Sequence, residues 1–147
     1  MKRWPIPHWE KLIAIMPNQQ FIILGGKDDL FCEDLKMIAP DRVQNLAGKL
    51  SLVESCALIK NSKLVISADT GLLHVADVLG VKALSLMGPT AFGFTTGTQI
   101  KTLEVALPCR PCTKDGRGTC SQEVYQKCMV DITPEWVAKE AQLMLAE

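Results

Sequence analysis

The feature that most constrains this chain is a regular alternation of short apolar runs with segments whose apolar residues are spaced as in a helix. The runs Phe21–Leu24 and Val81–Met87 both end at glycines, and Leu64–Ser67 is a third run of the same kind. Between the runs, apolar residues recur every three or four positions. Strands that alternate with helices pair in parallel, because a crossover helix joins one strand to the next. The sequence therefore predicts an α/β fold with a parallel sheet flanked by helices.

The same spacing gives the expected order of elements. Ser51 and Glu54 lie three residues apart and can cap each other's backbone N–H groups at a helix start, and Thr133 before Pro134 marks another start. Residues 88–97 are rich in glycine and threonine and are expected to form a loop. The expected strands cover residues 21–24, 42–46, 64–67, 81–87 and 101–107, and the expected helices cover residues 7–16, 31–38, 51–60, 70–79 and 133 onwards.

Composition and charge exclude several classes of protein. The 147 residues are 48% hydrophobic, which is enough for the core of a single domain over residues 1–147. Sixteen basic residues balance sixteen acidic ones, so no nucleic-acid partner is expected. The sequence has no run of 18 apolar residues and no signal-peptide core, which predicts a cytoplasmic protein. Cys32 and Cys56 fall inside expected helices and are expected to be buried, reduced thiols.

The segment from Ser67 to His74 carries the features of an anion site. Ligands of open parallel sheets bind beyond the carboxyl ends of the strands, where helix N-termini present free N–H groups. Asp69 or Thr70 can cap the helix, Gly71 permits a ligand to approach the backbone, and His74 lies one turn further on the same face. A pyrophosphate fits such a site. The alternative is that Asp69 and Thr70 are only caps and that His74 is a half-buried structural histidine.

Two further strand exits are expected at the same edge of the sheet. Gly88, Pro89 and Thr90 would bring backbone N–H groups and a hydroxyl to the cleft. After the glycine pair at residues 25 and 26, Asp28 or Asp29 could accept hydrogen bonds from ribose or sugar hydroxyls. The sequence is equally consistent with two aspartates that simply begin a helix.

The order of these motifs resembles a known family. Over nearly its whole length the chain is similar to the C-terminal domain of glycosyltransferase family 9, the ADP-heptose:lipopolysaccharide heptosyltransferases. The resemblance implies half of a GT-B fold, in which two Rossmann-like domains face a cleft and the C-terminal one binds the ADP-sugar. It also implies inverting transfer of heptose to the lipopolysaccharide inner core, with no cofactor and no metal. The motifs are Lys-Arg-Trp-Pro at residues 2–5, Leu-Gly-Gly at 24–26, Asn-Leu-Ala-Gly-Lys-Leu-Ser-Leu at 45–52, Asp-Thr-Gly-Leu-Leu-His-Val-Ala at 69–76 and Gly-Pro-Thr at 88–90.

The resemblance implies roles for individual residues near the phosphates. Lys2 matches the family's lysine that faces the donor, although a lysine near a chain start is usually a solvated charge. Thr70, Gly71 and His74 match the family's pyrophosphate loop and helix.

Acidic residues of the chain match positions that contact sugars in the family. Asp69 matches an aspartate on the donor sugar, and Asp29 falls near the acidic residue on the ribose, although the spacing also permits Asp28. The expected donor site consists of Lys2, Asp29, Asp69, Thr70, Gly71, His74, Gly88, Pro89 and Thr90.

The sequence departs from the family's pattern in one large respect. Family members have an N-terminal domain that holds the acceptor site and the aspartate thought to act as general base, and the first strand of the donor domain would precede Lys2. We therefore expect a fragment that does not transfer sugar alone and that meets the lipopolysaccharide acceptor only with the N-terminal domain. A sheet without its central strand leaves backbone unpaired, which leaves room for self-association. The family also implies a peripheral location at the inner membrane.

Four cysteines near the end of the chain are weak candidates for a metal site. Cys109 and Cys112 have the Cys-x-x-Cys spacing of a zinc-ligand pair, whereas seven residues separate Cys120 from Cys128. Four thiolates suffice for a tetrahedral zinc ion, but the second spacing does not favour one. We expect a packed loop of reduced thiols and no metal, with disulfides as the alternative under oxidising conditions.

Three functional hypotheses remain. The leading one is the donor-binding part of a heptosyltransferase, which binds an ADP-sugar and stabilises the departing diphosphate. The second is a related GT-B domain that uses a UDP-sugar, and selectivity between adenine and uracil would separate the two. The third is a non-catalytic, zinc-stabilised interaction domain in which residues 69–74 are only a capped helix. Zinc binding without nucleotide binding would favour the third.

Overall fold

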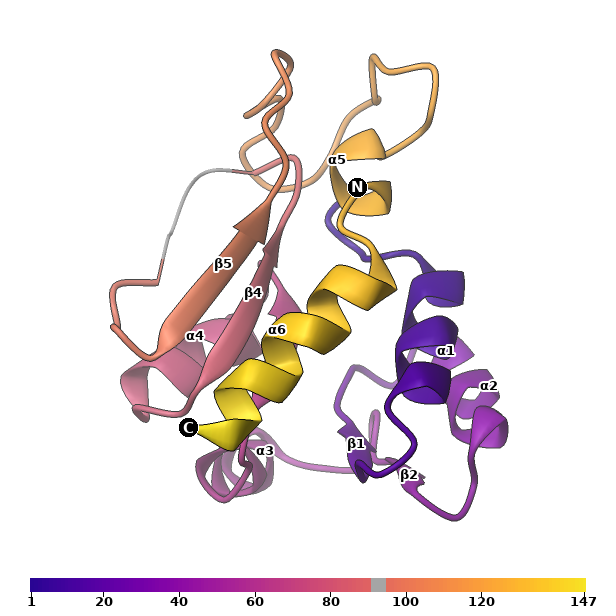
Figure 1. The fold of residues 1–147 in the computed structure, drawn as a ribbon, viewed down its shortest axis with the longest axis vertical. Helices are drawn as coiled ribbons and strands as arrows, with labels where there is room; N and C mark the ends of the chain where they lie inside the picture. Colours follow the sequence, from indigo (N-terminus) through magenta and orange to yellow (C-terminus); the bar gives the residue numbers. More distant parts are fainter. Residues whose placement is uncertain (91–94) are drawn as a thin grey trace.

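The predicted alternation of strands and helices is present in the structure. A computed structural model describes residues 1–90 and 95–147 (Figure 1), so part of the loop expected at residues 88–97 lies outside the described residues. The elements in chain order are α1 (Ile6–Ile15), β1 (Phe21–Ile23), α2 (Phe31–Ile38), β2 (Val43–Asn45), α3 (Leu52–Lys60), β3 (Val65–Ala68), α4 (Gly71–Val78), β4 (Ala83–Met87), β5 (Ile100–Glu104), α5 (Lys127–Val130) and α6 (Pro134–Ala146).

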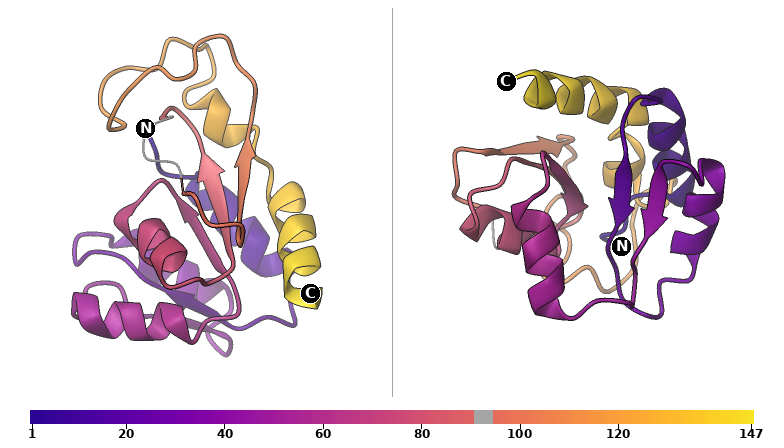
Figure 2. Two further views of the ribbon diagram at one scale, coloured as in Figure 1. Left: turned by 90° about the vertical axis from the view of Figure 1, so that its left-hand side faces the viewer. Right: turned by 90° about the horizontal axis from the view of Figure 1, so that it is seen from below.

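The strands form two separate parallel sheets instead of the single sheet expected from the sequence. β1 pairs with β2, with Phe21 opposite Val43. In the second sheet β4 lies between β3 and β5, and Ser85 is opposite Ser67 on one side and Thr102 on the other. In the described part of the chain no strand joins the two sheets, so β1 and β3 each keep one unpaired edge. In the right-hand view of Figure 2, β1 is the strand of its sheet nearest to the three-stranded sheet, and β3 is the strand of that sheet nearest to β1.

Helices cover both faces of the three-stranded sheet, as the sequence predicted. α6 lies on one face, and α3 and α4 lie on the other (Figure 2). β4 is buried at all five positions because it has a strand on each side and a helix layer above and below. α2 packs on β2, and α1 packs against both α2 and α6, which connects the two sheets through side chains. No helix among the described residues is long and apolar enough to cross a bilayer.

Trp4 ties the beginning of the chain to the main hydrophobic core. Its side chain is fully buried, and its indole N–H donates to the carbonyl oxygen of Ile132 at 2.8 Å. The ring also makes edge contacts with the rings of His8 and Trp9. This anchor holds the adjacent residue pair at positions 2 and 3 near the carboxyl ends of the strands.

Several details of the sequence-based expectation were wrong. β3 begins and ends one residue later than the expected range 64–67, and as an edge strand it is only partly buried at three of its four positions. β5 ends at Glu104 rather than at residue 107, because the Arg110 guanidinium binds the Val105 carbonyl at 2.6 Å where the ladder would continue. Cys32 is buried as expected, whereas Cys56 is only half-buried. α5 was not expected, because four residues are too few to show helical spacing.

The start of α3 confirms the predicted capping box. The backbone N–H of Glu54 donates to Ser51 Oγ at 3.3 Å, and the Glu54 carboxylate accepts from the Ser51 backbone N–H at 2.7 Å. The hydrogen bond from the Ser51 backbone lowers the pKa of Glu54, and the bond from the Ser51 hydroxyl adds to this effect. The two residues thus satisfy N–H groups that the helix itself leaves unpaired.

The substitution Ser51→Ala is expected to lower the free energy of unfolding by about 1 kcal/mol, because α3 loses one hydrogen bond at its first turn. Urea denaturation followed by circular dichroism measures this change. Ser51→Gly is the matched control and should cost only a few tenths of a kcal/mol, about the loss reported for glycine caps. Equal stability of the alanine variant and the unmodified chain would contradict the capping role.

Candidate functional site

Asp69 is the centre of a polar cluster at the carboxyl ends of β3 and β4. The residue is only 8% exposed, and its Oδ2 accepts the Thr90 hydroxyl at 2.8 Å. Lys2 Nζ lies 3.5 Å from Oδ2, and His74 Nε2 lies 3.7 Å from Oδ1. A nearly buried carboxylate requires such partners, because an unpaired one would lose its hydration without compensation. The structure therefore brings together four predicted site residues: Lys2, Asp69, His74 and Thr90.

Local structure explains how each member reaches the cluster. Asp69 follows the last residue of β3, and the fully buried Thr90 follows β4, the neighbouring strand. Parallel neighbours end at the same edge of the sheet, so their following residues meet. His74 lies one helical turn into α4, and Lys2 is held by the buried side chain of Trp4 two residues later. The cluster thus joins three elements and the N-terminal segment.

The start of α4 presents open backbone beside this cluster. Thr70 is the N-cap residue, but its side chain does not cap the helix, so the expected cap from Asp69 or Thr70 was wrong. The Thr70 hydroxyl instead bonds to Ser67 Oγ at 2.9 Å. A Cβ added at Gly71 would meet no atom within 4 Å. Free N–H groups next to open space are the features of an anion site at a helix start.

Asp29, rather than Asp28, is turned toward the N-terminal segment. Asp29 Oδ2 accepts the Gly26 backbone N–H at 2.8 Å, which shapes the turn after β1. Its Oδ1 pairs with the Arg3 guanidinium at 3.0 Å, and that guanidinium lies 4.5 Å from the centre of the Phe31 ring. Asp28 is exposed. Lys2 and Arg3, which are neighbours in the sequence, therefore pair with Asp69 and Asp29 respectively.

Gly88 and Pro89 contact the loop that follows β5. The Gly88 carbonyl accepts from Arg110 Nε at 2.6 Å, and the Pro89 carbonyl accepts from the Cys112 N–H at 3.1 Å. A Cβ at Gly88 would collide with the side chain of Met129, so packing alone explains this glycine. Of the predicted Gly-Pro-Thr motif, Thr90 is the residue that contacts Asp69.

An apolar depression of about 300 Å³ opens between α3 and α4 beside the polar cluster. The imidazole of His74 is 43% exposed and lies at this depression as well as near Asp69. The surface next to the helix start therefore combines open backbone with apolar side chains. The depression is lined by Cys56, Gly71, His74, Val75, Val78 and Leu79.

Two residues of this region were not among the predicted site residues. Arg3 reaches Asp29, and its place beside Lys2 in a basic pair was a usable signal. Ser67 bonds to Thr70, and a hydroxyl three residues before the N-cap was the corresponding signal.

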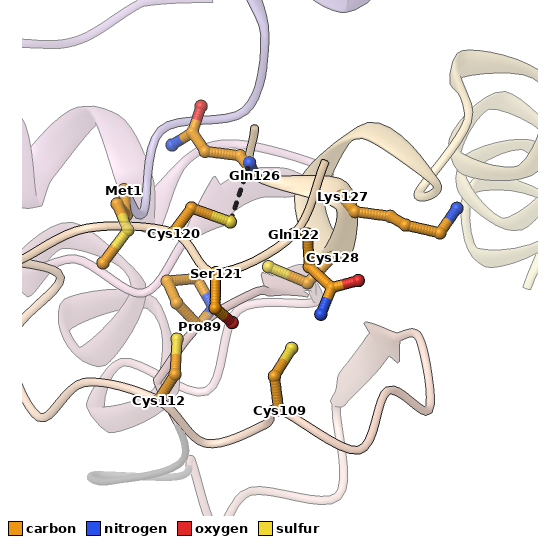
Figure 3. Close-up of a pocket in the computed structure, with 10 residues that line it drawn as sticks. All are labelled: Met1, Pro89, Cys109, Cys112, Cys120, Ser121, Gln122, Gln126, Lys127 and Cys128. Carbon is orange, nitrogen blue, oxygen red and sulfur yellow. Dashed lines mark hydrogen bonds between the residues drawn. The ribbon is translucent and has the colours of Figure 1, made fainter. Parts of the chain in front are cut away.

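The four late cysteines lie together in a different pocket. Cys109, Cys112, Cys120 and Cys128 all line it, and Pro89 forms part of its wall (Figure 3). All four are free thiols. The pocket adjoins the polar cluster, because Pro89 lines the pocket and the next residue, Thr90, bonds to Asp69.

Comparison with protein families and curated proteins gives consistent matches. Residues 1–126 match the family described as glycosyltransferase family 9 (heptosyltransferase). The chain is 29% identical to lipooligosaccharide heptosyltransferase 2 of Haemophilus influenzae over 99% of its own length and 44% of that protein. It is 31% identical to lipopolysaccharide heptosyltransferase 1 of Pseudomonas aeruginosa over 98% of its length and 44% of that protein. The chain therefore spans less than half the length of these relatives.

Comparison with solved structures supports the fold. The Escherichia coli ADP-heptose lipopolysaccharide heptosyltransferase II superposes with a TM-score of 0.79 at 24% identity, over 99% of this chain and 42% of that one. The E. coli heptosyltransferase WaaC with ADP-2-deoxy-2-fluoro heptose gives 0.70 at 21% identity, over 97% of this chain and 39% of that one. These likenesses confirm a Rossmann-like, partial GT-B fold.

Proposed function

Because this chain belongs to glycosyltransferase family 9, the heptosyltransferases, we propose that it binds the ADP-sugar donor of a heptose transfer at the Asp69 cluster. The observation that carries this proposal is the convergence of Lys2, His74 and Thr90 on Asp69 beside the open start of α4. An ammonium, an imidazole and free backbone N–H groups are suitable partners for a diphosphate.

The diphosphate binds between Lys2 and the first turn of α4 in this proposal. Lys2 keeps a third of its side chain exposed while it pairs with Asp69, and His74 is more exposed still. Both can therefore add a phosphate contact without leaving Asp69. The absence of a side chain at Gly71 leaves room for a phosphate oxygen at the helix start. Asp69 orients the two donors, and its carboxylate contacts the donor sugar.

The ribose hydroxyls contact Asp29 in the same proposal. Its carboxylate is part-exposed while it holds Gly26 and Arg3, and each of its oxygens can accept a further hydrogen bond. Arg3 links this position to Lys2, so the ribose and the diphosphate would be bound by adjacent residues of one segment.

The contribution to catalysis is stabilisation of the departing diphosphate by preorganised positive groups. The only carboxylate of the cluster, Asp69, is nearly buried and already accepts from Thr90, so it is a poor general base. We assign the general base and the lipopolysaccharide acceptor site to the part of the relatives that this chain does not span. In this proposal the chain by itself binds the donor but does not carry out the inverting transfer. It acts in the cytoplasm or at the inner membrane.

Titration calorimetry with ADP and then UDP tests the donor site. We expect ADP to bind selectively, and we expect His74→Ala and Thr70→Val each to weaken binding roughly tenfold, about 1.4 kcal/mol. Thr70→Val removes a hydroxyl without removing a helix cap, because the Thr70 side chain caps nothing. Lys63→Ala is the control, since Lys63 is exposed and precedes β3 at the opposite end of the sheet.

The outcomes of this titration separate the hypotheses. If UDP binds selectively and the His74 and Thr70 variants weaken its binding, the donor at this site is a UDP-sugar rather than an ADP-sugar. A folded chain that binds neither nucleotide would contradict a donor site on this chain. Equal effects of the Lys63 control and the site variants would show that the losses come from general destabilisation.

A further inference from the structure

The loop that follows β5 has little support from the hydrophobic core. None of the three core clusters of the described chain includes a side chain from residues 108–127. Val124 and Tyr125, the large apolar residues of this loop, are exposed. Loops of this length without helix or strand are uncommon in compact domains and usually have a function. Small segments that lack a core are commonly held by disulfides or metal ions.

The pocket in this loop combines four thiols in a very small space. Cys109, Cys112, Cys120 and Cys128 turn their sulfur atoms toward its interior (Figure 3). The cavity volume is about 10 Å³, enough for one water-sized particle but not for an organic ligand. Among the described residues, no carboxylate or imidazole lines the pocket. Its size excludes an organic ligand, and its donor atoms are soft.

We infer that these four cysteines bind one Zn²⁺ ion as a tetrahedral tetrathiolate site. Thiolate ligands select zinc over magnesium or calcium, which prefer oxygen. Four protein ligands with no position left for water are characteristic of a structural site. The role of the ion is to fix the loop that packs on Pro89 and on the N-terminal segment.

A backbone hydrogen bond fixes the position of one of the four thiols. The Gln126 backbone N–H donates to Cys120 Sγ at 3.4 Å (dashed line in Figure 3). Lys127 also lines the pocket, but its ammonium points away from the sulfur atoms (Figure 3) and pairs with Asp131 at 2.6 Å.

Binding requires the thiols to draw closer together. In the described part of the chain, no three thiol, imidazole or carboxylate groups are already arranged around one metal position. Zinc binding is commonly coupled to the ordering of the ligand loop. Residues 108–127 place no side chain in the three core clusters, although Arg110 and Cys112 are held by the carbonyls of Gly88 and Pro89. The sequence offered these four cysteines only as weak metal candidates, because seven residues separate Cys120 from Cys128, and the fold brings these two thiols to the Cys-x-x-Cys pair.

Cobalt substitution provides the test. The full chain is reduced, freed of metal and titrated with Co²⁺ under anaerobic conditions. We expect one equivalent to bind, with strong sulfur-to-cobalt charge-transfer absorption and the visible bands of tetrahedral Co²⁺, and Zn²⁺ should displace it. Bound Zn²⁺ should also protect four of the six cysteines from alkylation. Cys109→Ser with Cys112→Ser should abolish these signals, whereas Cys56→Ser, in α3, is the matched control and should leave them unchanged.

Several outcomes would overturn the inference. A reduced chain with native circular dichroism that binds no Co²⁺ would do so, as would weak absorption typical of oxygen ligands. Persistence of the full signal in the double variant would place the metal elsewhere. Disulfides that form in air, without metal uptake after reduction, would assign the cluster to disulfide chemistry. ADP calorimetry tests the donor site independently of the metal titration, so a negative result in one experiment does not decide the other proposal.

Discussion

Replacing Trp4 by alanine is expected to lower the free energy of unfolding by about 3–5 kcal/mol, as truncation of a buried tryptophan generally does. The side chain is fully buried in the core that contains β4 and α6, so its loss leaves a large cavity. The Ile132 carbonyl also loses its indole donor. Urea denaturation followed by far-ultraviolet circular dichroism measures the change, because this signal does not depend on the removed indole.

Trp4→Phe separates the two contributions to this loss. Phenylalanine retains much of the ring packing against His8 and Trp9 but leaves the Ile132 carbonyl without its donor, which should cost about 1–3 kcal/mol. Trp136→Ala, on the part-buried Trp136, is the matched control and should cost less than Trp4→Ala. An alanine variant at position 4 as stable as the unmodified chain would show that the N-terminal segment does not belong to the core.

Replacing Lys2 by methionine is expected to weaken ADP binding roughly ten- to a hundredfold, because a hydrogen bond to a charged group contributes about 1.5–3 kcal/mol. The change removes a cation from the proposed diphosphate position. It also leaves the carboxylate of Asp69, 3.5 Å from Lys2 Nζ, without its ion-pair partner, so the ligand meets an uncompensated negative charge. Methionine keeps the length of the side chain, which limits the loss of packing.

AMP gives this measurement a sharp internal control. If Lys2 contacts the diphosphate, Lys2→Met should remove most of the preference for ADP over AMP. Lys63→Met makes the same chemical change at an exposed position before β3 and should leave both affinities unchanged. An unaltered ADP affinity in the Lys2 variant would show that Lys2 does not contact the ligand and is only a charge near the beginning of the chain.

Local signals in the sequence were sufficient for most of the elements. The capping pair Ser51 and Glu54 and the Thr133-Pro134 start placed α3 and α6 correctly, because caps depend on residues a few positions apart. The end of β5 depends on Arg110, a contact that hydrophobic spacing does not encode. The division into two sheets was also beyond local patterns, since strand pairing joins residues far apart in the chain.

The site shows the same division between local and distant information. Asp69, Thr70, Gly71 and His74 are contiguous enough to be recognised as one motif, and the rule that parallel strands end at one edge brought Thr90 to them. The packing of Gly88 on Met129 could not be predicted in this way, because α5 itself gave no signal. The four cysteines were recognised together as weak metal candidates, but their meeting in one pocket depends on the fold.

The division of the sheet also has a consequence for cooperativity. The backbone hydrogen bonds of β1 with β2 and those of β3, β4 and β5 are separate ladders, connected through the side-chain packing of α1 on α6. Regions joined only by side chains can open as separate units with different free energies, which amide hydrogen exchange resolves. A ligand held by both the N-terminal segment and the start of α4 would link the opening of these units. When the ligand is bound, the amide hydrogens of β1 and β2 would then exchange together with those of β3 and β4.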